Sequence, residues 1–324
     1  MIKKIYYVLF MLLSSLLMAC APVGDSDDDD DDDDDVVTTT TGVINTSNPA
    51  EIQALASVAY RSTLALYELA RNSAETTLLG SGGKIPTSAD CLNGGQVVRN
   101  SFSGVAPLSS GDALSLTYIN CQTSFAGQTI TQNGQVDLFS ATVSGDQYNI
   151  DLTFMGYSIT TVSGQALSKV NGSLNLFIDS ISNSNSFKHY LIRSHLSAGN
   201  SVSFQLSDGV TTTLNLSQNF FSVTEDQLNN NYLIDVRYIF SATTAAGLPL
   251  TFGSLVVDSR AMPLSSLNAN SSALSPPTSG VMLINDNSNR QIRLDAMTPA
   301  VSTSVNGVVG SAVSVDWTVF LTGS

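Results

Sequence analysis

The chain has 324 residues, of which 43% are hydrophobic and 12% charged, and its formal net charge at pH 7 is −14. Ten of its 27 acidic residues and two of its 13 basic residues precede Val36, so the chain from Val36 onward carries a net charge of −6. Because no basic patch offsets the repulsion of phosphate groups, nucleic acid is excluded as a partner.

The first 20 residues have the pattern of an export signal. Lys3 and Lys4 form a short positive segment, and an apolar run from Ile5 to Met18 follows. This run is several residues shorter than the roughly 20 needed to span a bilayer, so it predicts a cleaved signal peptide over residues 1–19. The run ends in the sequence Leu17-Met18-Ala19-Cys20.

This ending resembles the type II signal peptides of bacterial lipoproteins, whose lipobox has an apolar residue at −3, a small residue at −1 and an invariant cysteine. Met18 departs from the small or β-branched residue usual at −2. The resemblance implies lipidation of Cys20, and several acyl chains on one residue would hold the protein to a membrane almost permanently. By analogy with lipoproteins of diderm bacteria, Ala21 points to the outer membrane, at its periplasmic face or the cell surface. The alternative is an ordinary secretory signal with a chance cysteine.

The chain has three cysteines, an odd number that needs an explanation in an exported protein. Lipidation of Cys20 leaves Cys91 and Cys121, which an oxidising compartment would join in a disulfide. The bond would close a loop of about 30 residues and stabilise the domain by roughly 3 to 4 kcal/mol. Two unpaired buried thiols are the alternative.

Residues 20–47 are predicted to be the lipidated cysteine followed by a disordered tether. The nine aspartates of Asp27–Asp35 cannot bury apolar surface, and their mutual repulsion keeps the segment extended. A spacer is the interpretation we favour. Weak binding of divalent cations by Asp27–Asp35 and an acidic signal for transport to the cell surface are the alternatives.

An amphipathic helix is predicted over residues 48–80. Asn48 suits the N-cap, Pro49 suits the first helical position, and Glu51 can complete a capping box. Apolar residues then recur at helical spacing to about Leu78, before a glycine-rich stop. Charged residues such as Glu68 fall largely off the apolar stripe, so we expect one face of the helix to dock on the domain.

Residues 81–324 are predicted to form a mainly β, large antiparallel domain, either a sandwich or a curved sheet. Apolar and polar residues alternate in short segments, as in Leu114–Tyr118 and the last one, Val313–Leu321, which predicts about 14 to 16 strands. Asn-Gly and Asp-Gly pairs are predicted turns between the strands. These pairs include Asn133-Gly134, Asn171-Gly172, Asp208-Gly209 and Asn306-Gly307. Residues 259–279 are a candidate seam between subdomains.

Catalytic signatures are sparse, and no cofactor or metal is expected. The chain contains no Gly-x-Ser-x-Gly elbow, no phosphate-binding loop and no His-Glu-x-x-His motif. His189 and His195 would lie about 20 Å apart along one strand, which is too far to share a metal. The segment Asp286–Asn289 resembles the start of a calcium loop but lacks its glycine and distal glutamate, so we predict a hairpin turn.

Four carboxylates are candidates for acid–base chemistry because they lie in or beside predicted strands: Asp137, Asp151, Asp179 and Asp235. The alternation places Asp137 and Asp151 on the polar side of their strands, so both are expected to face solvent. The favoured function is a non-enzymatic binding or scaffolding module that contacts an envelope protein or polysaccharide. A carrier of lipid or another apolar ligand in a curved sheet, gated by the helix, and a glycan-active enzyme are the alternatives.

Overall fold

The structure is a computed structural model, and it describes part of the unit Thr39–Ser324. Cys20, the acidic run, the predicted helix end near Leu78 and His195 lie outside the described residues. The described ranges are 43–44, 48–74, 89–103, 109–125, 128–144, 147–160, 166–180, 187–193, 201–226, 231–243, 251–258, 264–266 and 277–322, the last without 289, 298, 307, 309 and 310.

The long helix α2 spans Pro49–Ala74 and begins as the sequence predicts. The Asn48 carbonyl oxygen accepts the first intrahelical bond from Ile52, and its side-chain oxygen accepts the backbone N–H of Ala50 at 3.1 Å. The amide of Asn48 in turn donates to the Glu51 carboxylate at 2.9 Å. These contacts satisfy donors that have no partner within the helix, so they fix its first turn.

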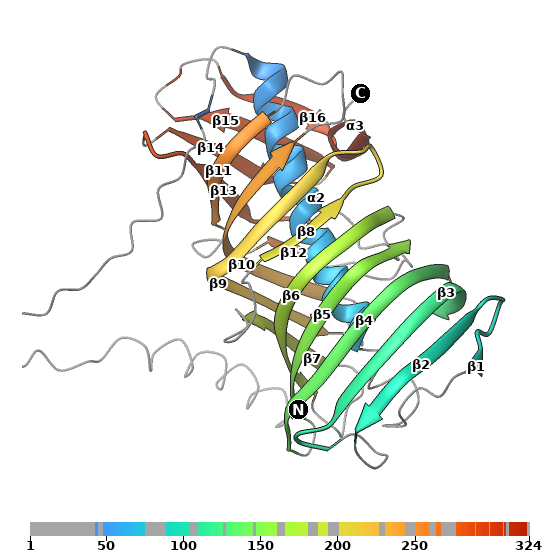
Figure 1. Cartoon of the computed structure of the whole chain (residues 1–324). Helices are drawn as coiled ribbons and strands as arrows, with labels where there is room; N and C mark the ends of the chain where they lie inside the picture. The colour runs from blue at the N-terminus through green and yellow to red at the C-terminus, as the bar shows by residue number, and fades with distance from the viewer. Residues whose placement is uncertain are drawn as a thin grey trace, which may run out of the picture. The chain divides into compact units, whose positions relative to one another are not determined.

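The middle of α2 is buried all around, whereas the sequence predicted that only one face of the helix would dock on the domain. Every residue from Leu55 to Ala70 is buried, including Arg61 and Glu68, and the latter is only 1% exposed. The cause is the sheet, which curves around the helix instead of meeting it on one side (Figure 1). The interior of the unit is therefore built around α2.

The fold is mainly β, as predicted, and within the described residues sixteen strands form one antiparallel sheet that follows α2. Consecutive strands are neighbours along most of the sheet, so the topology is a long meander. The strands are β1 (Ala89–Asp90), β2 (Gln96–Ser103), β3 (Ala113–Phe125), β4 (Gln128–Ser144), β5 (Gln147–Thr160), β6 (Ala166–Ser180), β7 (Phe187–Arg193), β8 (Ser201–Gln205), β9 (Thr211–Asp226), β10 (Asn231–Thr243), β11 (Thr251–Asp258), β12 (Leu264–Ser266), β13 (Val281–Asn285), β14 (Gln291–Ala296), β15 (Ala300–Val305) and β16 (Val313–Asp316).

Two positions in the sheet are each shared by a pair of short strands. β7 and β8 both lie between β6 and β9, where they pair with different halves of those long strands. β11 and β12 likewise pair with different halves of β10. Because β12 belongs to the expected seam at 259–279 and hydrogen-bonds to β10, this part of the seam is integrated into the sheet.

Two Asn-Gly pairs predicted to be turns lie inside strands, opposite β-bulges of the neighbouring strands, so that prediction is wrong for them. Gly134 lies within β4 with φ +91°, and Gly172 lies within β6 with φ +114°. The Asn133 side-chain oxygen accepts the backbone N–H of Asn120 on β3, and that of Asn171 accepts the N–H of Gly156 on β5. Both pairs interrupt the register, and such bulges bend a strand and increase its twist.

Asp208-Gly209 is a turn as predicted, because the Gly209 N–H donates to Leu206 between β8 and β9. The hairpin predicted at Asp286–Asn289 is also present, joining β13 to β14. The Asp286 side-chain oxygen accepts the backbone N–H groups of Ser288 and Arg290, at 2.8 and 2.9 Å. This carboxylate therefore binds backbone amides of its own turn.

The predicted last strand, Val313–Leu321, is wrong in its second half. β16 ends at Asp316, and Trp317–Thr322 is a short helix, α3. Asp316 caps this helix by accepting the N–H of Thr318 at 2.7 Å. A helical turn brings Trp317 and Phe320 to the same side, and both rings pack against Tyr60 of α2. Packing against α2 therefore overrides the alternating pattern.

The chain enters the described unit at Val43–Ile44, beside the β13–β14 hairpin. Ile44 is 1% exposed, its N–H donates to the Asp286 carboxylate at 3.0 Å, and its carbonyl accepts from the Arg290 guanidinium at 2.8 Å. The expected tether, residues 20–47, therefore contains a fixed point at Ile44. An apolar side chain with both backbone groups bonded explains why the segment is held here.

Candidate binding face

The outer face of β3–β6 carries a network of polar side chains. Gln135 donates to Asp137 at 2.9 Å and to Ser115 at 3.2 Å, so it links β4 to β3. The hydroxyls of Thr153 and Ser173 are 3.0 Å apart and link β5 to β6. All of them except Ser173 are partly exposed, because the residues that alternate with them on each strand are buried against the interior; Ser173 is itself only 5% exposed.

A second set of contacts extends this network. Asn175 on β6 donates to Asp151 at 2.7 Å and to the Asn149 side chain at 2.8 Å, both on β5. Asn100, beside β3, donates to the hydroxyl of Thr117 at 2.8 Å. Hydrogen bonds thus fix the positions of hydroxyl, amide and carboxylate groups on neighbouring strands.

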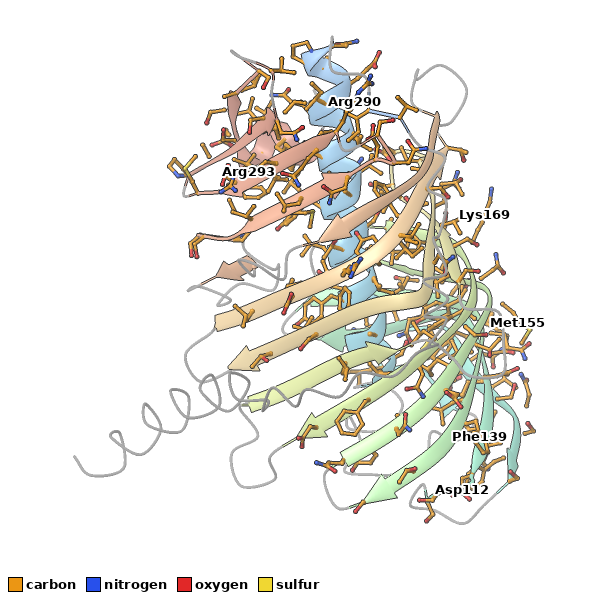
Figure 2. The ribbon with its side chains drawn as sticks, turned by 90° about the vertical axis from the view of Figure 1, so that its left-hand side faces the viewer. Asp112, Phe139, Met155, Lys169, Arg290 and Arg293 are labelled. Atoms are coloured by element: carbon orange, nitrogen blue, oxygen red, sulfur yellow. A yellow bond between two sulfur atoms is a disulfide. The ribbon has the colours of Figure 1, made fainter. Side chains whose placement is uncertain are left out.

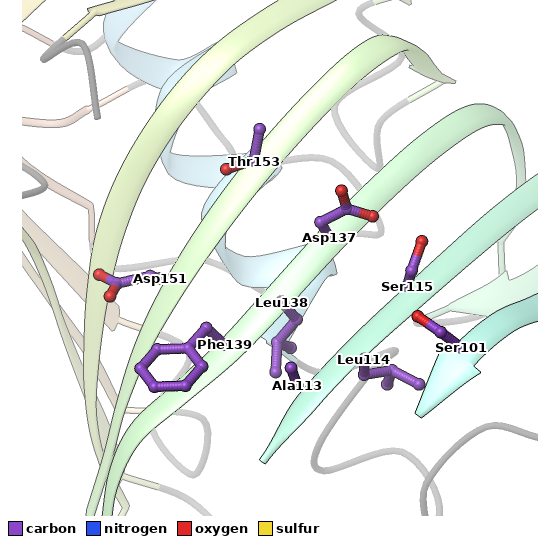
Figure 3. A pocket seen from close by; sticks show the side chains of 9 residues that line it. All are labelled: Ser101, Ala113, Leu114, Ser115, Asp137, Leu138, Phe139, Asp151 and Thr153. Atoms are coloured by element: carbon purple, nitrogen blue, oxygen red, sulfur yellow. The ribbon is translucent and has the colours of Figure 1, made fainter. Parts of the chain in front are cut away.

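A hollow of about 290 Å³ lies on this face (Figure 3). Four strands, β2–β5, contribute its lining, which is Ser101, Ala113, Leu114, Ser115, Asp137, Leu138, Phe139, Asp151 and Thr153. Phe139 is 45% exposed, and on its strand it stands between Ala113 of β3 and Asp151 of β5. Figure 2 shows Phe139 and Met155 on the outer side of these strands, at the end of the sheet away from Arg290 and Arg293.

The structure brings two of the four candidate carboxylates, Asp137 and Asp151, into the lining of the same hollow. Their carboxylates diverge: Asp151 leans toward β6, where Asn175 binds it, and Asp137 points away from Asp151 (Figure 3). Asp179 on β6 and Asp235 on β10 are not among the lining residues. In a glycosidase the two carboxylates flank a single glycosidic bond, whereas Asp137 and Asp151 point in different directions.

The inner side of the sheet is occupied by α2 and tied to it by polar contacts. The Tyr238 hydroxyl is 2.7 Å from the Thr63 hydroxyl and donates to the Ala59 carbonyl at 3.0 Å. Burial raises the pKa of the Tyr238 phenol, so the group stays neutral and able to donate. Arg61 forms an ion pair with Asp208 at 2.7 Å. The helix thus fills the space in which a carrier would hold its ligand.

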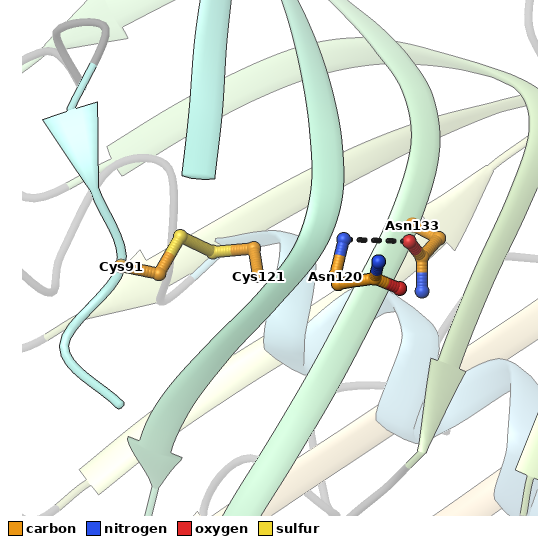
Figure 4. The surroundings of a disulfide bond; sticks show 4 residues. All are labelled: Cys91, Asn120, Cys121 and Asn133. Atoms are coloured by element: carbon orange, nitrogen blue, oxygen red, sulfur yellow. Dashed lines mark hydrogen bonds between the residues drawn. A yellow bond between two sulfur atoms is a disulfide. The ribbon is translucent and has the colours of Figure 1, made fainter. Parts of the chain in front are cut away.

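The predicted disulfide between Cys91 and Cys121 is confirmed, with a Cα–Cα distance of 5.3 Å (Figure 4). It connects the turn between β1 and β2 to β3, next to the bulge that contains Asn120. Asn120 has φ +47°, a conformation that asparagine tolerates better than most residues. The bond therefore joins the first strands of the sheet, toward the opposite end of β3 from the residues that line the hollow.

The remaining candidates show no site. His189 lies on β7, paired in register with Asp179, while its expected partner His195 is outside the described residues. Within the described part of the chain, no group of three His, Cys, Asp or Glu residues is placed to hold a metal ion. No helix among the described residues is long and apolar enough to cross a membrane.

Sequence reasoning did not single out Phe139, which lines the hollow, although the alternation places it on the outer face. Val136 and Leu138 are buried, so strict alternation places the intervening and following residues outward. Single exposed apolar side chains are common on protein surfaces, so the outward phase of one phenylalanine does not mark a site. Alternation within β4 does not reveal the register with β3 and β5, which places Phe139 between Ala113 and Asp151.

Comparisons with known proteins do not add a family: no family model, no curated protein and no solved structure matches this chain.

Proposed function

We propose that the protein is an exported lipoprotein, anchored to the outer membrane of the cell envelope through lipid on Cys20, that acts as a non-enzymatic binding module. Its binding face is the outer face of β3–β6. One observation carries this proposal: α2 fills the inner side of the sheet, whereas the outer side presents ordered polar groups around an open hollow.

Presentation of this face agrees with where the chain enters the unit. Ile44 is fixed at the β13–β14 hairpin, and β3–β5 lie at the other end of the sheet (Figure 1). A tether attached at the hairpin leaves the β3–β6 face uncovered by the attachment itself. The acidic run would act as the spacer between this hairpin and the membrane.

The anchor is tested by replacing Cys20 with serine and following the protein through detergent phase separation. The lipobox predicts that wild type enters the detergent phase and that the variant stays in the aqueous phase. If the variant partitions like wild type, the anchor is not lipid on Cys20.

The binding face is tested by placing an arginine on it. Thr153→Arg puts a bulky charge beside the hollow, and Ser302→Arg is a matched control on β15. Both positions are partly exposed, and each pairs with an aspartate on one side and a serine on the other. The lipidated full chain, in detergent micelles, is incubated with envelope extract immobilised on beads.

We expect Thr153→Arg to weaken retention on the beads about tenfold, because an arginine would block the hollow and break the polar network. Ser302→Arg should leave retention unchanged. Equal loss in both variants, or no loss in either, would contradict the assignment of the face.

A further inference from the structure

We infer that the hollow on β2–β5 binds an uncharged, hydroxyl-rich sugar chain, with one ring stacked on Phe139. The inference rests on the proposed function and names the ligand class of the same face. It depends on three features of the hollow: an exposed aromatic residue, polar groups that donate and accept hydrogen bonds, and two carboxylates that point in different directions.

Phe139 supplies the apolar part of the site. Its ring is 45% exposed and lies between Ala113 and Asp151 in the sheet. The face of an aromatic ring carries partial negative charge, and it attracts the weakly positive C–H groups on one side of a sugar ring. An exposed aromatic beside fixed polar groups is therefore suited to a ligand that has both C–H and O–H surfaces.

The polar lining matches hydroxyls. Ser101, Ser115 and Thr153 can each donate and accept, whereas Asp137 and Asp151 only accept. Asn175 and Gln135 hold the two carboxylates in place, so their orientation is set before a ligand arrives. Prepositioned groups reduce the ordering cost of binding.

The charges exclude other ligand classes. Two carboxylates and no basic side chain line the hollow among the described residues, so an acidic polysaccharide would be repelled. The carboxylates also diverge, so they cannot converge on one small cation (Figure 3). The lining comes from four adjacent strands, so a chain that runs across the strands can contact side chains from each of them.

The test is calorimetric titration of the lipidated full chain, in micelles, with cellohexaose and mannohexaose as neutral probes. Oligogalacturonate of equal length and spermine are the acidic and cationic probes. Variants are Phe139→Ala, Asp151→Asn and the matched control Met155→Ala. Met155 is 42% exposed on the same face but is not among the residues that line the hollow.

We expect at least one neutral probe to bind saturably, with affinity reduced about tenfold by Phe139→Ala and severalfold by Asp151→Asn, and unchanged by Met155→Ala. The acidic probe should not bind at the hollow, and any binding of spermine through the carboxylates should not depend on Phe139. The inference is overturned if no neutral probe binds, if Phe139→Ala and Met155→Ala behave alike, or if spermine or the acidic probe binds with the same dependence on Phe139.

The result separates this inference from the proposed function. If Thr153→Arg abolishes retention on envelope extract while no neutral sugar binds, the face is functional and only the ligand class is wrong. If sugar binds but Thr153→Arg retains full binding to the extract, the sugar site stands and the proposed role of the face in the envelope fails.

Discussion

The two ends of the sheet differ in the length of their strands and in the contacts that hold them. β3–β6 are 13 to 17 residues long and bend at bulges as they curve around α2, whereas β13–β16 have only four to six residues. At the long-strand end, glycines, asparagine side chains and a disulfide maintain the bend. At the short-strand end, a buried carboxylate and a short helix hold the chain.

The difference in strand length determines how much outer surface each end of the sheet presents. Long strands that bend around a helix have an outer face broad enough for a network of polar side chains and a hollow. Short strands leave room instead for Ile44 and α3, which pack against the hairpin and α2. In the function that we propose, the first end binds a partner and the second end is where the tether joins the domain.

The largest effect is expected from Gly134→Ala at the long-strand end. A Cβ at this position would overlap the carbonyl oxygen of Gly156, and φ is +91°. We expect a loss of about 3 to 5 kcal/mol in the free energy of unfolding, measured by denaturant titration. Gly111→Ala is the control: its φ is +86° but nothing lies within 4 Å, so the loss should be about 1 kcal/mol. Equal losses would show that the bulge is not tightly packed.

The second effect concerns the disulfide. Replacing Cys91 and Cys121 together by serine should destabilise the protein by about 3 to 4 kcal/mol, because the unfolded chain regains the freedom of a loop of about 30 residues. Amide hydrogen exchange should show the loss of protection first in β1–β3. If β13–β16 lose protection equally, the bond supports the whole sheet and the two ends are not independent.

The smallest effect is expected at the attachment end. Asp286→Ala removes the acceptor of three backbone N–H groups, those of Ile44, Ser288 and Arg290. We expect a loss of about 2 to 3 kcal/mol, since the buried N–H of Ile44 and the two partly buried N–H groups lose their acceptor. Asp295→Ala, whose ion pair with Arg293 lies at the surface, should cost less than about 1 kcal/mol. Similar values for both aspartates would contradict the role of Asp286.

Features that depend on local chemistry could be predicted from the sequence. The start of α2 at Asn48 follows from capping residues within one turn, and the Cys91–Cys121 bond follows from the parity of the cysteines. The inward phase of the β3–β6 strands follows from alternation. The Asp286 turn also follows from its own short sequence.

Features that depend on neighbouring strands could not be predicted. An Asn-Gly pair supplies a positive φ to a turn or to a strand position opposite a bulge alike, and only the register with β3 and β5 places Gly134 opposite bulges. Burial of Glu68 depends on a sheet that curves around the helix. The hollow requires the register of four strands, so neither Phe139 nor the proximity of Asp137 and Asp151 follows from any one segment.

The central claim, that the long-strand end is the working surface, is tested most directly by photo-crosslinking in living cells. A photoreactive phenylalanine analogue is placed at Phe139 or at Val319 of α3, each of which is 45% exposed. We predict adducts with envelope components from position 139 and none from position 319. Adducts from position 319 alone, or equal adducts from both positions, would contradict the account.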